Sequence, residues 1–160
     1  MTLDYNGKVV IVTGAGGGLG RCHALEFARR GAKVVVNDLG GAVDGSGGSS
    51  EAADKVVEEI KTAGGEAISN GSSVTDDAGV ANMVQQTMDA YGRIDVLVNN
   101  AGVLRDKSFA KMKIADFDFV VDVHLFGTMK PTKAVWPIMK EQGYGRIMVT
   151  SSSSGLYGNF

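Results

Sequence analysis

The residues most able to do chemistry begin with a glycine-rich run near the start of the chain. The run reads Thr13-Gly14-Ala15-Gly16-Gly17-Gly18-Leu19-Gly20. A backbone without side chains can approach a diphosphate closely. A helix that starts at such a turn also offers free N–H groups and the positive end of its dipole. The run predicts a dinucleotide-binding turn, although methyltransferases and turns without a ligand use similar glycines.

An acidic residue follows at the end of the next apolar run. Asp38 comes directly after Val34-Val35-Val36-Asn37. An acid at this place accepts hydrogen bonds from the ribose hydroxyls of an adenosine and repels a 2′-phosphate. The two nearest arginines precede the run, at the end of the predicted first helix. We therefore expect NAD rather than NADP. The alternative is an aspartate that only begins the following loop.

A second polar segment, Asn99-Asn100-Ala101-Gly102, follows the apolar run at residues 96–98. Amides at the end of a buried strand need hydrogen-bond partners. The small residues after them would let a flat ring approach the backbone. This segment argues against a methyl-donor site, and its plain alternative is a simple turn.

The elements that would position these residues alternate between short apolar runs and amphipathic segments. Apolar runs at residues 9–12, 34–36, 96–98 and 147–149, with a weaker one near 67–68, predict buried parallel strands. Helical periodicity in residues 53–60 and 80–91 predicts helices between them. The order predicts a single α/β domain over residues 1–160, with a doubly wound parallel sheet and helices on both faces.

Two segments leave alternatives open. A long helix is predicted from Ala115 to Gln142, with a kink or break where Pro131 and Pro137 lie inside it, or with a shorter helix starting at Pro131. The glycine- and serine-rich residues 39–50 predict a mobile surface loop. Because they follow the second strand, they could instead close over a ligand at its adenosine end.

Composition limits the partners and the compartment. The chain has 160 residues and a net charge of −2, without a basic stripe, so we expect no nucleic-acid partner. Its single cysteine, Cys22, and the lack of a signal-peptide pattern predict a cytoplasmic, reducing location. No apolar run approaches about 20 residues, so no membrane insertion is expected. No metal site is predicted.

Together, the glycine run, Asp38 and the segment 99–102 resemble the classical short-chain dehydrogenase/reductase family over the whole chain. The resemblance implies a Rossmann-like fold. It also implies that the glycine run binds the pyrophosphate of the cofactor and that residues 99–102 support its nicotinamide side. The implied cofactor-binding residues are Thr13, Gly14, Gly16, Gly18, Leu19, Gly20, Asp38, Asn99, Asn100, Ala101 and Gly102.

Further segments resemble a narrower subgroup, the (3R)-hydroxyacyl-CoA dehydrogenase modules of peroxisomal multifunctional enzymes of type 2 and their bacterial relatives. These segments include residues 102–106, 122–125 and 155–160. The resemblance implies NAD-dependent oxidation of a 3-hydroxyacyl-CoA, or the reverse reaction. It also implies a homodimer or tetramer when complete, and a peroxisomal location in a eukaryote. The alternative is a non-catalytic dinucleotide-binding module or fragment.

The resemblance assigns catalytic roles to two residues. Ser152, the second serine of the run at 151–154, would polarise the reacting oxygen. His124 replaces the asparagine that most members use in a proton relay, and this histidine is shared with the acyl-CoA subgroup. A histidine packed on a helix and bonded to backbone is the alternative. The family's tyrosine and lysine would come after Phe160, so we expect a truncated domain, and Tyr157 is not the base.

Overall fold

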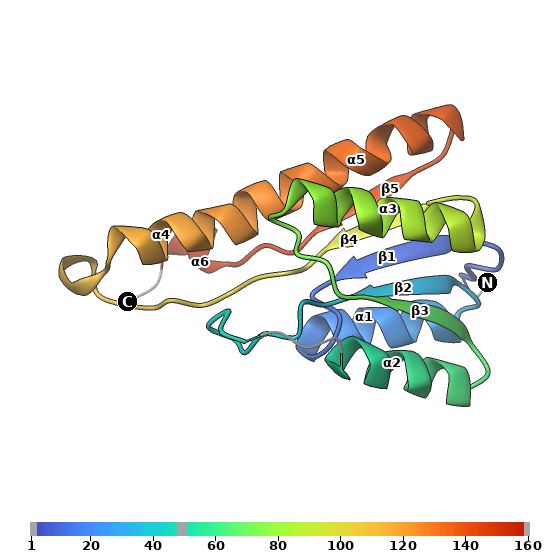
Figure 1. Ribbon diagram of the computed structural model, residues 1–160, viewed down its shortest axis with the longest axis horizontal. Helices are drawn as coiled ribbons and strands as arrows, with labels where there is room; N and C mark the ends of the chain where they lie inside the picture. The colour runs from blue at the N-terminus through green and yellow to red at the C-terminus, as the bar shows by residue number, and fades with distance from the viewer. Residues whose placement is uncertain (1–2, 48–50, 159–160) are drawn as a thin grey trace.

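The computed structural model describes residues 3–47 and 51–158. In this part of the chain, five parallel strands form a sheet in the order β3-β2-β1-β4-β5 (Figure 1). Each predicted apolar run is one of these strands, so the predicted doubly wound fold is confirmed. The strands are β1 (Val9–Thr13), β2 (Lys33–Asn37), β3 (Glu66–Asn70), β4 (Val96–Asn99) and β5 (Arg146–Val149).

Helices cover both faces of the sheet (Figure 1). Because successive strand residues point to opposite faces, Val10 and Val12 join the core under α1 (Gly18–Arg29) and α2 (Glu51–Thr62). Ile11, between them, packs instead with residues of α3 (Asp77–Tyr91) and α5 (Gly127–Glu141). The near-continuous valine runs of the strands are explained by this burial on two sides.

The direction of chain progression reverses at β1. This strand pairs in parallel with β2 on one side and with β4 on the other. The connections that leave β1 and β4 therefore diverge, and a crevice opens at the carboxyl ends of these two strands. The glycine run follows β1 and the asparagine pair lies at the end of β4, so the fold brings both predicted segments to this crevice.

The helix over residues 114–141 is continuous in direction but not uniform. It consists of α4 (Ile114–Val121), a π-helical turn η2 (Asp122–Phe126) and α5. The predicted break at the prolines is wrong, since Pro131 and Pro137 both lie inside α5. Pro131 belongs to a buried stripe spaced at four residues, and Pro137 is exposed, where water can solvate the unbonded carbonyl. The burial of this stripe outweighs the free-energy cost of a proline inside the helix.

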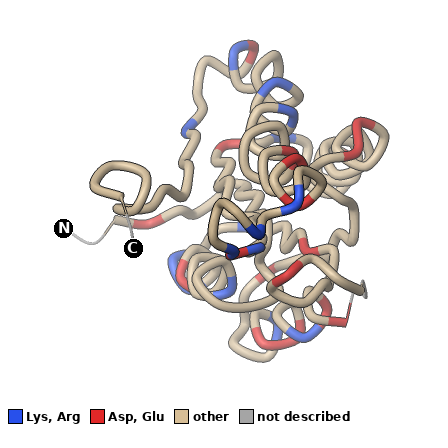
Figure 2. Tube along the Cα trace, turned by 90° about the vertical axis from the view of Figure 1, so that its left-hand side faces the viewer, with Lys and Arg blue, Asp and Glu red and all other residues tan. Residues whose placement is uncertain are grey.

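The remaining elements are short. A 3-10 turn, η1 (Phe109–Lys111), precedes α4, and α6 (Ser154–Tyr157) follows β5. Asp76 caps α3, because its carboxylate accepts the Gly79 N–H at 2.7 Å. Lys/Arg and Asp/Glu positions are interspersed along the trace (Figure 2). Among the helices that the structure describes, none is long and apolar enough to cross a bilayer.

Candidate functional site

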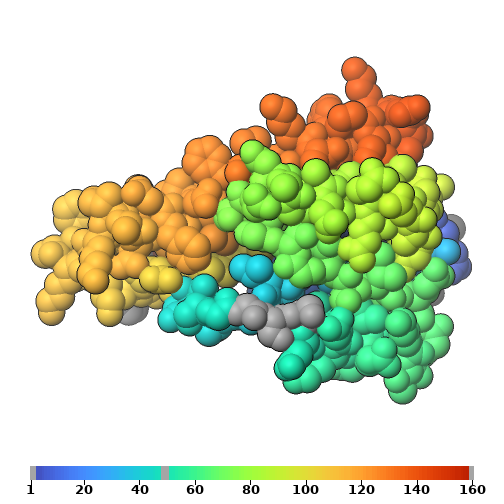
Figure 3. Space-filling view, in the orientation of Figure 1, coloured from blue at the N-terminus to red at the C-terminus, as the bar shows by residue number. Residues whose placement is uncertain are grey.

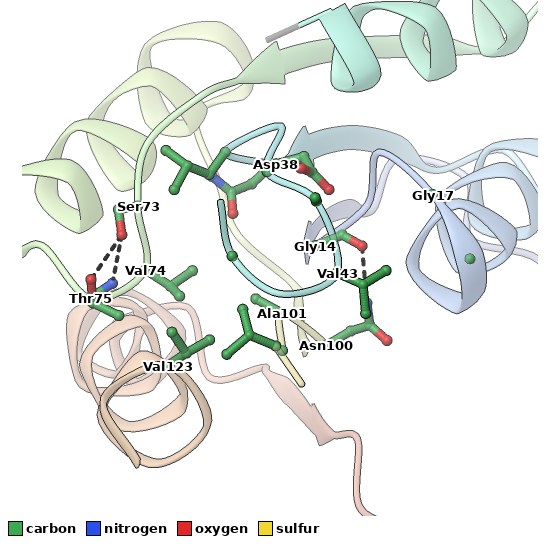
Figure 4. A pocket seen from close by; sticks show the side chains of 18 of the residues that line it. Gly14, Gly17, Asp38, Val43, Ser73, Val74, Thr75, Asn100, Ala101 and Val123 are labelled. Carbon is green, nitrogen blue, oxygen red and sulfur yellow. Dashed lines mark hydrogen bonds between the residues drawn. The ribbon is translucent and has the colours of Figure 1, made fainter. Parts of the chain in front are cut away.

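A cavity of about 430 Å³ lies at the crevice between β1 and β4 (Figure 4). This size is within the range of about 300–1,000 Å³ that is usual for ligand pockets. Asp38 is the one charged residue among the described residues that line it. The walls come from the glycine run, the segments that follow β2, β3 and β4, and the side chains of Phe119 and Val123.

Three glycines of the run are required by the packing of the protein itself. Gly14 has a φ of +62°, and a Cβ there would lie 2.8 Å from the Ala101 Cα. A Cβ on Gly16 would lie 2.8 Å from the Asp38 carboxylate, and one on Gly20 would collide with the Gly14 carbonyl oxygen. These glycines let the turn fold against the ends of β2 and β4.

The next part of the run is open instead. A Cβ on Gly17 or Gly18 would meet no atom within 4 Å, and both residues line the cavity. The helix α1 begins here, and its capping residue, Gly17, has no side chain that could accept a hydrogen bond from the first N–H groups. The neighbouring Leu19 is 65% exposed and lies outside the cavity lining. A phosphate group would fit at Gly17 and Gly18.

The half-buried Asp38 carboxylate is held by backbone N–H groups. Its Oδ2 accepts the Gly16 N–H at 2.7 Å, and its Oδ1 accepts the Gly40 N–H at 2.6 Å. Across the described ranges, no lysine or arginine nitrogen comes within 4 Å of it. Its negative charge is therefore stabilised by amides and stays available to hydrogen-bond donors in the cavity.

Thr13 and Asn100 join the glycine run to the end of β4. The buried Thr13 Oγ1 donates to the Val98 carbonyl at 3.3 Å and accepts the N–H groups of Asn100 and Ala101 at 3.0 and 3.1 Å. The Asn100 Nδ2 donates to the Thr13 and Gly14 carbonyls at 3.1 Å. The Thr150 hydroxyl donates to the Asn100 Oδ1 at 3.2 Å. The predicted need of the amide for partners is confirmed.

Other residues of the asparagine segment differ in position. Ala101 and Gly102 line the cavity, as does Asn100, whereas Asn99 is buried behind it. The Asn99 Nδ2 donates to the Thr132 hydroxyl of α5 at 3.0 Å. Its Oδ1 is buried and finds no hydrogen-bond partner within the described part of the chain. Asn99 thus ties the sheet to α5, and its neighbours form the cavity wall.

His124 lies on the π-helical turn and contacts the backbone after β4. Its Nε2 is 3.1 Å from the Val103 nitrogen and 2.9 Å from the Val103 carbonyl oxygen, so the ring accepts or donates according to its tautomer. A Cβ on Gly102 would lie 2.8 Å from the His124 Cε1. The ring is exposed and outside the cavity lining. It adopts the backbone-bonded position that the sequence leaves as an alternative.

Ser152 is exposed and also lies outside the cavity lining. Its Oγ accepts the Ser154 N–H at 3.1 Å, which leaves the hydroxyl proton available to another acceptor. Tyr157, on α6, is 87% exposed. Of the predicted site residues, the cavity lining includes Gly14, Gly18, Asp38, Asn100, Ala101 and Gly102, and it does not include Thr13, Gly16, Leu19, Gly20, Asn99, His124 or Ser152.

Several lining residues are not predicted as site residues from the sequence. The segment 72–75 after β3 lines the cavity, and there the Ser73 and Thr75 hydroxyls are 2.9 Å apart. Phe119 and Val123 contribute from the helix, and Ala42 and Val43 from the glycine-rich loop. Their residue types are ordinary for helix faces and loops, so only the topology identifies them. Residues 48–50 of the predicted loop lie outside the described residues.

Comparisons with known proteins agree with this geometry. The family model for short chain dehydrogenases matches residues 8–160. Peroxisomal multifunctional enzyme A of Dictyostelium discoideum is 59% identical over 160 residues, which are 100% of this chain and 36% of that protein. The sequence thus spans about a third of this relative's length.

Two solved structures share the fold. A short chain dehydrogenase from Mycobacterium avium superposes with a TM-score of 0.85 and 48% identity, over 97% of this chain and 56% of that chain. A 7α-hydroxysteroid dehydrogenase, complexed with NADH and 7-oxo glycochenodeoxycholic acid, gives a TM-score of 0.88 and 32% identity, over 98% and 58%. From the family match and the shared fold, this chain belongs to the short-chain dehydrogenase family.

Proposed function

We propose that the chain forms the NAD-binding part of an oxidoreductase that transfers a hydride between a 3-hydroxyacyl-CoA and the nicotinamide ring. The observation that carries the proposal is the half-buried Asp38 carboxylate, held by two backbone N–H groups at the edge of the cavity. The multifunctional enzyme of Dictyostelium and the NADH complex of the hydroxysteroid dehydrogenase support it as relatives.

The cavity residues fit a dinucleotide. Asp38 would accept hydrogen bonds from the ribose hydroxyls, and its charge would disfavour a 2′-phosphate, so NAD is preferred over NADP. The open positions at Gly17 and Gly18, beside the uncapped start of α1, would receive the pyrophosphate. The small residues Ala101 and Gly102 would border the nicotinamide end.

The chemistry divides between the cofactor and the chain. NAD supplies a hydride acceptor when it is bound. As the hydride leaves the carbon, a proton must leave the alcohol oxygen, and the Ser152 hydroxyl, whose O–H is free, would orient that oxygen by donating a hydrogen bond to it. The proton itself would pass to the catalytic tyrosine of the family. The family resemblance also gives His124 a place in this relay, beside the Val103 backbone that its Nε2 contacts.

The direct test follows NADH absorbance in a mixture of the full-length protein, NAD and 3-hydroxybutyryl-CoA. We expect NADH to form, and expect Ser152→Ala to lower kcat by about 100-fold with an unchanged KM for NAD. Ser154→Ala is the matched control, because its backbone N–H still bonds to Ser152. Tight NAD binding without turnover would support a non-catalytic module instead, and failure to bind NAD would refute the proposal.

We also propose a homodimer or tetramer, located in the cytosol or, in a eukaryote, in peroxisomes. Exposed apolar side chains along the helix that runs from α4 to α5 support an interface: Ile114, Phe117, Leu125, Phe126, Met129 and Trp136. Sedimentation of the full-length protein is expected to give dimers or tetramers, and a monomer at micromolar concentration would contradict this. Fluorescence microscopy of the tagged protein checks the location.

A further inference from the structure

The glycine-rich segment at residues 39–47, here named the strap, connects two walls of the cavity. It leaves the end of β2 and meets the backbone that follows β4. The Leu104 N–H donates to the Val43 carbonyl at 3.0 Å, and the Arg105 Nε donates to the Asp44 carbonyl at 2.6 Å. In Figure 3 the cyan atoms of the strap lie beside the yellow atoms of the segment after β4.

The strap is folded by its own hydrogen bonds. The Ala42 N–H donates to the Ser46 carbonyl, and the Gly45 N–H donates to the Ala42 carbonyl, both at 2.8 Å. The Asp44 Oδ1 accepts the Ser46 N–H at 2.9 Å and the Ser46 hydroxyl at 2.6 Å. These two bonds hold the pKa of Asp44 below its usual value, so the turn keeps its acceptor at neutral pH. Residues 42–46 of the strap therefore form one hydrogen-bonded unit.

Arg105 holds the strap against α4 through three contacts. Besides its bond to the Asp44 carbonyl, its NH1 pairs with the Asp116 carboxylate at 2.8 Å. Its guanidinium carbon also lies 5.1 Å from the centre of the Phe119 ring. Arg105 is half-buried, with 34% of its side chain exposed, so these contacts are only partly screened by solvent.

The same ring receives the tip of the strap. Gly45 has a φ of +81°, and a Cβ there would lie 2.6 Å from the Phe119 Cε1, so the backbone packs directly on the ring. Val43, Gly45 and Phe119 line the cavity together with Gly14 and residues 100–102 of the other wall. The strap and Phe119 thus form one side of the space that the dinucleotide would occupy.

We propose that Arg105 is a positioning residue that fastens the strap over the cofactor cleft, and that release of the strap governs the exchange of NAD and NADH. The inference rests on the proposed function, because it takes the cavity to be the dinucleotide site. Losing the Arg105 contacts loosens the distal part of the strap, residues 42–47, from α4, while the Gly40 N–H at its start still holds the Asp38 carboxylate. The chemistry at the far end of the cofactor is then unaffected.

Two measurements on the full-length protein test this. Stopped-flow fluorescence measures the rate of NADH release, and hydrogen exchange at the Leu104 amide, in cofactor-free protein, reports whether the strap is fastened. For Arg105→Ala we expect both rates to rise about tenfold and the KM for NAD to rise, with kcat not reduced. Lys107→Ala removes a neighbouring exposed positive charge and is expected to keep both rates within about twofold of the wild type.

Each of the other outcomes would contradict one specific step of the inference or of the proposed function. Unchanged exchange at Leu104 in Arg105→Ala shows that Arg105 does not fasten the strap. Faster exchange with unchanged NADH release shows that the strap does not govern exchange of the cofactor, and the proposed function survives. Absence of NADH binding in the wild type overturns the proposed function itself. If Arg105→Ala does not fold, Asp116→Asn keeps the arginine without its partner and is expected to raise both rates about threefold; unchanged rates there overturn the inference.

Discussion

The two ends of the sheet each hold an aspartate, and the groups around the two carboxylates differ. At the amino end, the fully buried Asp95 accepts the Val9 N–H at 2.9 Å and pairs with Arg93 at 2.7 Å and Lys8 at 3.3 Å. At the carboxyl end, Asp38 is half-buried and bonds to two backbone N–H groups, at 2.7 and 2.6 Å.

The difference separates a structural charge from one that a ligand can use. The charge of Asp95 is neutralised by cations of the same chain, and its oxygens are occupied. A carboxylate can accept about four hydrogen bonds, so the two amide bonds of Asp38 leave acceptor capacity toward the cavity. The role of an acidic residue at a strand end can thus be inferred from the hydrogen-bond donors around its carboxylate.

The largest expected effect on stability is at the amino end. Asp95→Ala leaves the Val9 N–H without its partner and two cations unpaired, so we expect the free energy of unfolding in urea to fall by about 3 kcal/mol. The affinity of the folded fraction for NAD should not change. Asp89→Ala, at an exposed position of α3, is the matched control with a change within about 0.5 kcal/mol. A large loss of NAD affinity in Asp95→Ala would break the comparison.

At the carboxyl end of the sheet, substitutions at two glycines test two different roles: close packing of the turn, and open space for a ligand. Gly20→Ala puts a methyl group onto the Gly14 carbonyl, and we expect a loss of about 2 kcal/mol in urea unfolding. Gly17→Ala, with φ of −162° and open space around its Cβ, should stay within about 0.5 kcal/mol of the wild type. It should still weaken NAD binding in calorimetry. Unaltered affinity in Gly17→Ala would mean that the open space is not the phosphate site.

We expect low pH to destabilise the fold through protonation of the Asp95 carboxylate. Burial alone would raise the pKa of Asp95, but hydrogen bonds from Arg93, the Val9 N–H and Lys8 outweigh it and hold the pKa below its usual value. Because the folded state has the lower pKa, this stabilisation is present above the unfolded pKa of about 3.9 and is lost as pH falls through the folded value. Urea midpoints between pH 5 and pH 3 should therefore fall more in the wild type than in Asp95→Asn. Equal slopes would contradict this.

At Asp38 we expect a substitution to change ligand affinity more than stability. Asp38→Asn keeps one acceptor for the backbone and should cost about 1 kcal/mol, since the Gly40 N–H can turn to solvent. The affinity for NAD should fall about 10- to 100-fold in calorimetry, and the preference over NADP should shrink. A variant that binds NAD as tightly as the wild type would show that the two carboxylates do not differ in role.

Much of the fold follows from local pattern. The valine runs predict β1, β2 and β4, because strands buried on both faces need apolar residues at every position. The helix faces of α2 and α3 follow from residues spaced at three and four, and Asp76 marks the start of α3. The glycine run, Asp38 and Asn100 are likewise predicted, since their chemistry depends on positions at strand ends that the pattern locates.

The rest depends on tertiary contacts that no local pattern encodes. Pro131 predicts a break, but its burial in the α5 stripe outweighs the lost hydrogen bond. The pairing of Arg105 with the strap joins residues 61 positions apart in sequence, and its residue types are common in loops. The roles of Gly14 and Gly20 in protein packing, rather than in ligand approach, also become visible only where β4 meets the turn.

The π-helical turn η2 sets how α4 is rotated, about the axis of the long helix, relative to α5. A π-helical turn holds one residue more than the α-helical turn it replaces, and each residue of an α-helix rotates the chain by about 100°. Deletion of a single residue within Asp122–Phe126 would therefore rotate α4 about the helix axis and turn Phe119 away from the cavity wall. The packing of α5 on the sheet would be unchanged. An inserted residue usually disrupts a helix. Here it allows the first part of the helix to present Phe119 to the cavity while α5 packs Val135 and Met139 in the core.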